Sequence, residues 1–181
     1  MEVKNTKLLF LYRTCLFKFT RFSTNNKDLE LIVNALNIKN RRKRIEYVYD
    51  EAIKIINKYY YMDLCKFENN RCIAQRKMNL DRINGCCRMC NLVTETGCPS
   101  SNLACKLLYC KTALGNVKQL KFKDISILKC LSLEQKIILR SDFFETREEI
   151  ITDLYYGVVL YGIKSAYKEI KRSILNLKKR F

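Results

Sequence analysis

The sequence predicts a mainly α-helical fold in which a small helical domain carries an irregular cysteine-rich insert. Three observations predict it. Apolar residues recur at helical spacing over 41–62, and two signals for the start of a helix follow after residue 130. Between these regions, from about residue 64 to residue 110, helical spacing is absent. A chain of 181 residues can bury one sizeable core, and five glycines and one proline leave little room for flexible linkers.

The N-terminal region, 1–63, is expected to contain a basic arm and helices. Residues 1–27 fit a short strand or an irregular arm, and a short apolar segment follows at 29–36. In the helix expected over 41–62, the apolar residues lie at offsets of 0, 3, 7, 10, 11 and 14, which trace one helix face. They are Ile45, Val48, Ala52, Ile55, Ile56 and Tyr59.

The C-terminal region, 113–181, is expected to form helices that pack on the N-terminal helix. Ser132 and Gln135 have the spacing of a capping box, in which each side chain bonds the backbone N–H of the other residue. Thr146 and Glu149 have the same spacing and predict the start of one long helix. Acidic residues open that helix and basic residues close it, as the helix dipole favours.

The ten cysteines and the absence of histidine restrict the chemistry of the chain. Without histidine, Ser-His and Cys-His catalytic pairs cannot form within one chain, and a metal site must use thiolates or carboxylates. The sequence lacks a recognisable secretory signal and a long apolar run, so we expect a cytoplasmic protein. Clustered cysteines in a reducing compartment bind metal more often than they form disulfides.

Eight cysteines between Cys65 and Cys110 are the candidate metal ligands. They are Cys65, Cys72, Cys86, Cys87, Cys90, Cys98, Cys105 and Cys110. Cys87 and Cys90 form a CxxC pair, which can bring two thiolates to one metal, and Cys105 and Cys110 can supply a second pair, with Cys98 as competitor. Four thiolates suit zinc, while an iron–sulfur cluster also takes four cysteines. Disulfides and buried unliganded thiols are the alternatives.

The lack of apolar periodicity in 64–112 is a second reason to expect cross-links there. A long segment that cannot bury a hydrophobic face needs another means of ordering. Metal coordination would supply it, so the fold expected for 64–112 is an irregular metal-stapled module.

Within the insert, a paired cysteine at Cys86 and Cys87 is followed by Gly97-Cys98 and then by Cys105-Lys106-Leu107. This order resembles uncharacterised cysteine-cluster proteins of low-GC Gram-positive bacteria such as clostridia. It is more distantly similar to the YkgJ-like family, whose members are described as zinc- or iron-chelating proteins. The family's usual Arg-Pro before the later cysteine is replaced here by residues 102–104, Asn-Leu-Ala. The resemblance implies chelation and no particular substrate.

The net charge of +17 favours polyanionic partners, either nucleic acid or an anionic membrane surface. The densest basic run comprises Lys39, Arg41, Arg42, Lys43 and Arg44. These cations stand at the start of the expected helix, where they oppose the dipole, and this misfit favours contact with phosphates. The alternatives are a solvated helix face and the codon bias of an AT-rich genome.

The leading functional hypothesis is a small cytoplasmic metal-binding protein without enzymatic activity. Paired catalytic carboxylates, a phosphate-cradling glycine loop and a nucleophile motif are not found in the sequence, and no small-molecule substrate is indicated. One alternative is a nucleic-acid-associated regulatory factor whose basic surface is positioned by the metal module. Another is a thiol redox sensor that uses Cys87 and Cys90.

Overall fold

The computed structural model describes residues 1–7, 9, 20–60, 67–68, 71–72, 102–108, 114–141 and 145–178. For 67–68, 71–72, 168–169 and 171–178 it describes the backbone alone. Over these residues the protein is mainly helical, as the sequence predicts. Most of the insert predicted at 64–112, including its metal-stapled character, lies outside the described residues.

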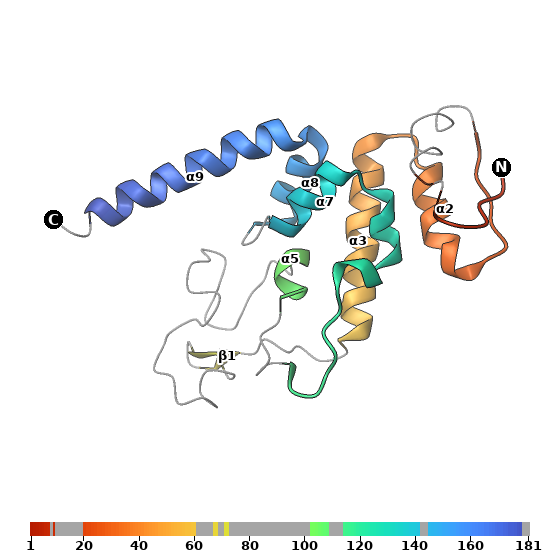
Figure 1. Cartoon of the computed structure of the whole chain (residues 1–181), viewed down its shortest axis with the longest axis horizontal. Coiled ribbons are helices and arrows are strands. Elements are labelled where there is room, and N and C mark those ends of the chain that lie inside the picture. Colours follow the sequence, from red (N-terminus) through yellow and green to blue (C-terminus); the bar gives the residue numbers. More distant parts are fainter. Residues whose placement is uncertain are drawn as a thin grey trace.

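The described regular elements are two long helices, α3 and α9, several short helices and a minimal hairpin (Figure 1). The α-helices are α2 (Glu30–Asn37), α3 (Arg41–Tyr59), α5 (Leu103–Lys106), α7 (Leu133–Ser141), α8 (Arg147–Tyr156) and α9 (Val158–Lys178). The 3-10 helices are η2 (Lys27–Leu29), η4 (Phe122–Asp124) and η5 (Ser126–Cys130). Strands β1 (Phe67–Glu68) and β2 (Arg71–Cys72) pair antiparallel. None of the described helices has both the length and the apolar character needed to cross a membrane.

Helix α3 is the centre of the core. It packs against α2 and η5 on one side and against α5 and α8 on the other (Figure 1). Its N-cap residue is Asn40, whose side chain accepts a hydrogen bond from the Lys43 N–H at 3.0 Å. The apolar face turned toward these neighbours follows the predicted spacing, since Ile45, Val48 and Ile56 are all buried.

The end of α3 differs from the prediction at its tyrosines. Tyr59 was expected on the buried face but is 40% exposed, and its hydroxyl donates to the Lys118 carbonyl oxygen at 3.0 Å. Tyr60, the C-cap residue, is buried instead, and its hydroxyl accepts a hydrogen bond from the Leu120 N–H at 2.8 Å. The backbone leaves helical geometry at Tyr60, so helical spacing no longer determines which tyrosine faces the core.

Both predicted capping boxes are confirmed. The Ser132 hydroxyl accepts from the Gln135 N–H at 3.1 Å, and the Gln135 side chain accepts from the Ser132 N–H at 2.9 Å. The equivalent bonds between Thr146 and Glu149 are 3.3 and 2.9 Å long. Each pair satisfies backbone N–H groups that the first turn of a helix cannot bond internally.

The single long helix predicted from Thr146 is wrong, because the chain breaks into α8 and α9 at Gly157. Gly157 has φ 89° and ψ −169°, a conformation that side-chain-bearing residues rarely adopt. Its N–H still bonds the Asp153 carbonyl oxygen at 2.9 Å, so α8 ends in a regular turn before the direction changes. The apolar pattern runs through this point, which is why periodicity alone predicted continuity.

The N-terminal arm pairs with the segment that precedes η2. Glu2 and Ser23 form an isolated parallel bridge, and both Val3 and Phe22 are buried. The Asn37 side chain fixes this arm to the end of α2, donating to the Phe22 carbonyl oxygen at 2.9 Å and accepting from the Phe22 N–H at 2.8 Å. The short extended arm therefore covers one end of the helical core.

Candidate functional site

The predicted cysteine ligands are only partly within the described structure. Cys72 belongs to β2, and Cys105 lies in α5 with a half-buried side chain. The other six predicted ligands lie outside the described residues. They are Cys65, Cys86, Cys87, Cys90, Cys98 and Cys110. Within the described part of the chain, no group of three or more cysteine, histidine, aspartate or glutamate side chains could hold a metal ion.

The turn that carries Cys105 is fixed to the helical core by Asn102. The Asn102 side chain is fully buried. Its Oδ1 accepts from the N–H groups of Ala104 and Cys105 at 2.8 and 3.3 Å, and its Nδ2 donates to the Glu145 carbonyl oxygen at 3.2 Å. Because this one side chain both caps α5 and bonds the segment before α8, it determines where the turn can sit.

Helix α3 holds the same turn from the other side. The Leu103 N–H donates to the Tyr49 hydroxyl at 3.2 Å, and the Lys106 ammonium donates to the Asn57 side chain at 2.6 Å. Leu103 is fully buried against the core. Cys105 thus stands on a short helix that hydrogen bonds and apolar burial attach to the core.

The chain leaves α3 at Tyr60 and is bound to α3 again at 102–106. Further along, the Gln119 side chain donates to the Leu107 carbonyl oxygen at 2.7 Å, and the Leu120 N–H bonds Tyr60. Both ends of the segment 61–101 are therefore attached to the same helix. Bringing the two ends of a loop together costs conformational entropy. Here the contacts of both ends with α3 offset that cost.

The five residues of the predicted basic run are split among several partners. The Lys39 ammonium donates to the Thr20 carbonyl oxygen at 3.2 Å, and the Arg44 guanidinium donates to the Ile38 carbonyl oxygen at 3.0 Å. The first bond joins the loop before α3 to the N-terminal arm, and the second joins it to α3. Both cations therefore have a structural role as well as a positive charge.

The other three residues of the run are exposed. Arg42 forms a 3.3 Å ion pair with Glu46, one turn further along α3. The Arg41 guanidinium lies over the ring of Tyr155, 5.4 Å from its centre. Exposed pairs of this kind contribute little to stability and exchange readily with other partners. Arg41, Arg42 and Lys43 are therefore the members of the run that can best reach an external anion.

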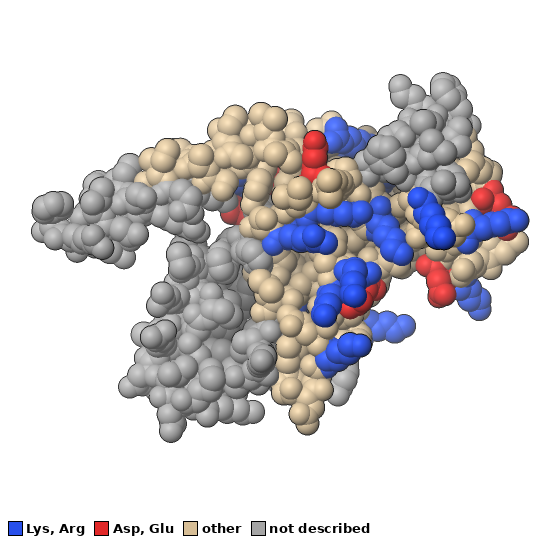
Figure 2. All heavy atoms as spheres, viewed as in Figure 1, with Lys and Arg blue, Asp and Glu red and all other residues tan. Residues whose placement is uncertain are grey.

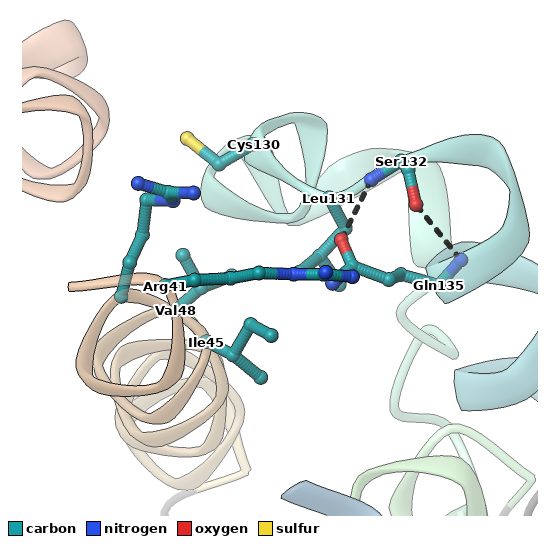
Figure 3. Close-up of a pocket in the computed structure, with 8 residues that line it drawn as sticks. Arg41, Ile45, Val48, Cys130, Leu131, Ser132 and Gln135 are labelled. Carbon is teal, nitrogen blue, oxygen red and sulfur yellow. Dashed lines mark hydrogen bonds between the residues drawn. The ribbon is translucent and has the colours of Figure 1, made fainter. Parts of the chain in front are cut away.

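Arg41 and Arg44 also line a small hollow between α3 and the η5–α7 junction (Figure 3). Its volume is about 100 Å³. The remaining lining residues are Ile45, Val48, Cys130, Leu131, Ser132 and Gln135. Figure 3 shows the Ser132–Gln135 capping pair at one end of the hollow and Cys130 at the other. Sequence reasoning missed this site, because it joins residues that are about 90 positions apart.

A guanidinium–carboxylate pair connects α3 to α8 near this region. Arg147 bonds both carboxylate oxygens of Asp50, through Nε and Nη2, at 2.7 Å each. These hydrogen bonds raise the already high pKa of the Arg147 guanidinium, so this cation stays charged and paired. The pair therefore joins α3 to α8.

Comparisons of the chain with protein-family models, with curated proteins and with solved structures find no match. The resemblance of the insert to chelating cysteine-cluster proteins therefore stays a prediction.

Proposed function

We propose that the chain is a small metal-binding protein in which cysteine thiolates of the insert hold zinc or, alternatively, an iron–sulfur cluster. The observation that carries this proposal is the concentration of eight of the ten cysteines between Cys65 and Cys110, in a chain without histidine. Thiolates are the ligands that both cofactors use in closed structural sites. Reducing cytoplasm, where such thiolates persist, is the compartment that fits the proposal.

The attachment of Cys105 to the core supports the proposal. A ligand whose backbone is already fixed loses less conformational entropy when it binds a metal. Cys105 satisfies this condition, because Asn102 and Tyr49 hold the backbone of its turn. In the proposed protein the core places this one thiolate, and the remaining ligands order around the metal together with the insert.

Metal analysis of protein purified without oxygen tests the proposal. We expect bound zinc with no visible colour, or iron with the brown absorption of a cluster. Cys105→Ser should lower the bound metal, because it removes a proposed ligand from its fixed turn. Cys130→Ala is the control, because Cys130 is buried in η5 and is not one of the eight predicted ligands, so this variant should keep the metal. Protein that contains neither metal and has its insert cysteines in disulfides would contradict the proposal.

A second candidate function is the binding of nucleic acid through the surface that contains the basic run. Figure 2 shows Lys and Arg side chains gathered in a row over the region of α2 and α3, with few acidic side chains among them. The hollow lined by Arg41 and Arg44 lies at α3 and could hold a phosphate group. The clustering of Lys and Arg side chains on one surface favours this candidate, whereas the clustering of cysteines in the sequence favours the metal proposal.

The salt dependence of binding tests this second candidate. Affinity for duplex or single-stranded nucleic acid should fall steeply with salt and weaken further in the variant Arg41→Gln/Arg42→Gln. Lys54→Gln/Lys58→Gln is the matched control, since it also removes two exposed cations from the same helix, outside the basic run. An equal loss of affinity in both variants would show that only net charge matters. The basic run would then have no special role.

A further inference from the structure

Helix α9 is held to the core at its beginning only, as far as its side chains are described. It packs against α7 and α8, and its Lys164 enters an ionic cluster with two buried carboxylates. The Lys164 ammonium lies 2.7 Å from Asp153 Oδ2 and 3.6 Å from Glu145 Oε2. From there α9 runs outward from α8 and the rest of the helical core (Figure 1).

A stripe of large apolar side chains runs along α9, from its first turn to beyond Lys164. It consists of Val159, Ile163, Tyr167 and Ile170. Successive members are four, four and three residues apart, which places them on one face of the helix. Their exposed fractions lie between 60% and 79%, whereas Ile150 and Ile151 of the neighbouring α8 are fully buried. An exposed apolar row of this kind indicates a surface that contacts another protein, a ligand or a membrane.

The charge of α9 indicates the kind of molecule that would cover this stripe. Residues 158–178 contain five lysines and arginines and a single acidic residue, Glu169. Lys164 is already paired within the core, and the other four cations leave the segment clearly positive. A helix that combines an exposed apolar stripe with an excess of lysine and arginine has the character of helices that lie flat on anionic membranes.

We propose that α9 binds the surface of an anionic membrane. The apolar stripe would enter the boundary between headgroups and acyl chains. The basic residues of the helix and the net charge of +17 would be attracted to acidic lipid headgroups. The ionic cluster at Lys164 then links the membrane-bound helix to the core.

A lipid surface fits the observations better than other occupants. Nucleic acid would satisfy the charge but would leave the apolar stripe in water. A second copy of the chain would bring two molecules of charge +17 together. Val158, Val159 and Leu160 are each more than 40% exposed, and consecutive helical residues point in directions about 100° apart. One partner helix contacts a narrow seam, whereas a fluid lipid surface can cover this wider arc.

Sedimentation of the full-length protein with lipid vesicles tests the proposal. The vesicles contain either phosphatidylcholine alone or a mixture of phosphatidylcholine and phosphatidylserine. We expect binding about tenfold stronger to the mixed vesicles, and weaker in high salt. The variant Ile163→Ser/Ile170→Ser should bind the mixed vesicles about tenfold more weakly, because it removes two apolar contacts.

The matched control is Leu133→Ser/Ile137→Ser. It removes two apolar side chains that are 75% and 50% exposed on α7 instead of α9. This control should bind vesicles as the unmodified protein does, and circular dichroism should show native helix content in both variants. If the α9 variant and the α7 control bind equally well, or if binding is the same without phosphatidylserine, the proposal is wrong.

A tryptophan reporter identifies the occupant directly, because the chain contains no tryptophan. In Tyr167→Trp, emission should shift to the blue and become protected from a soluble quencher only when mixed vesicles are added. Emission that is already blue-shifted without lipid would mean that the protein's own chain, or a second copy, covers the stripe. That outcome would overturn the proposal. The metal content of the protein does not enter this readout, so the membrane and metal proposals fail or hold separately.

Discussion

At the scale of single residues, Asn102 determines how the cysteine insert meets the core. It is fully buried, and its amide makes three described hydrogen bonds to backbone groups. A buried amide is costly unless its polar atoms are bonded, and here its donor and acceptor connect different segments. Replacement by a residue of similar size cannot reproduce both functions, because aspartate lacks the donor and leucine lacks both groups.

Asn102→Ala should lower the free energy of unfolding by about 2 kcal/mol, since it removes a helix cap and leaves backbone groups unsatisfied. Denaturant unfolding monitored by circular dichroism measures this change. Asn116→Ala provides the comparison, because Asn116 is exposed and its replacement should change stability by less than about 0.5 kcal/mol. Similar losses in the two variants would mean that Asn102 does not act as an anchor.

Lys164 is a second residue whose removal should be costly. Lys164→Met should destabilise the protein by about 3 kcal/mol, because Asp153 is 2% exposed and would be left as a buried charge without its nearest cation. Adding Asp153→Asn to this variant should recover part of the loss. A double-mutant cycle by chemical denaturation measures the coupling, and an additive result would contradict the proposed pairing.

At the scale of elements, Gly157 separates α8 from α9 and sets the direction in which α9 leaves the core. A Cβ at this position would have room, since the nearest atom, Glu134 Oε2, would be 3.8 Å away. The constraint is therefore the backbone conformation with φ 89°, and not crowding.

Gly157→Ala should therefore cost about 1–2 kcal/mol, because alanine is strained at this φ and ψ. Gly162→Ala should have the opposite effect. Gly162 lies within α9 at ordinary helical φ with open space around it, so alanine should stabilise the helix by about 0.5–1 kcal/mol. Thermal unfolding of the two variants makes the comparison, and shifts of the same sign would contradict it.

The elements that the sequence predicts well are those with local signals. The start of α3 and both capping boxes follow from residues within one or two turns of each other. The break at Gly157 was missed, because a glycine in an apolar pattern indicates a bend only when its φ is known. Tyr60 is buried instead of Tyr59 because the backbone leaves helical geometry there, and its hydroxyl bonds Leu120, a residue far along the chain. The hollow at Arg41 and Arg44 depends on equally distant neighbours.

At the scale of the whole molecule, the described core takes only α5 from the region predicted as the cysteine insert. Its buried residues come from α2, α3, η5, α7 and α8, together with the N-terminal arm and α5. Of the eight predicted ligands, only Cys72 and Cys105 lie in described elements. The sequence predicts a set of eight candidate ligands, and that set stays a prediction. The sequence cannot predict which thiolates share a metal, because that depends on how the chain folds around the ion.

Removal of the metal should therefore affect the insert and leave the core intact. Under the metal proposal, a chelator should make residues 61–101 sensitive to protease, because this segment loses the coordination that orders it. The helical circular dichroism signal should change by less than about 10%, since hydrophobic burial holds the core together. Mass spectrometry of the fragments locates the cleavage. Simultaneous loss of the helical signal would mean that core and insert fold as one unit.

The attachment of both ends of the segment 61–101 to α3 has a consequence for how the sequence of this protein can evolve. A segment that departs from and returns to one rigid helix can gain, lose or exchange residues while the neighbouring scaffold keeps its shape. Tyr60 and Asn102 flank this segment, and their hydrogen bonds keep its two ends in place. Related chains could therefore share the helical scaffold while they differ widely in cysteine number and spacing between these two residues.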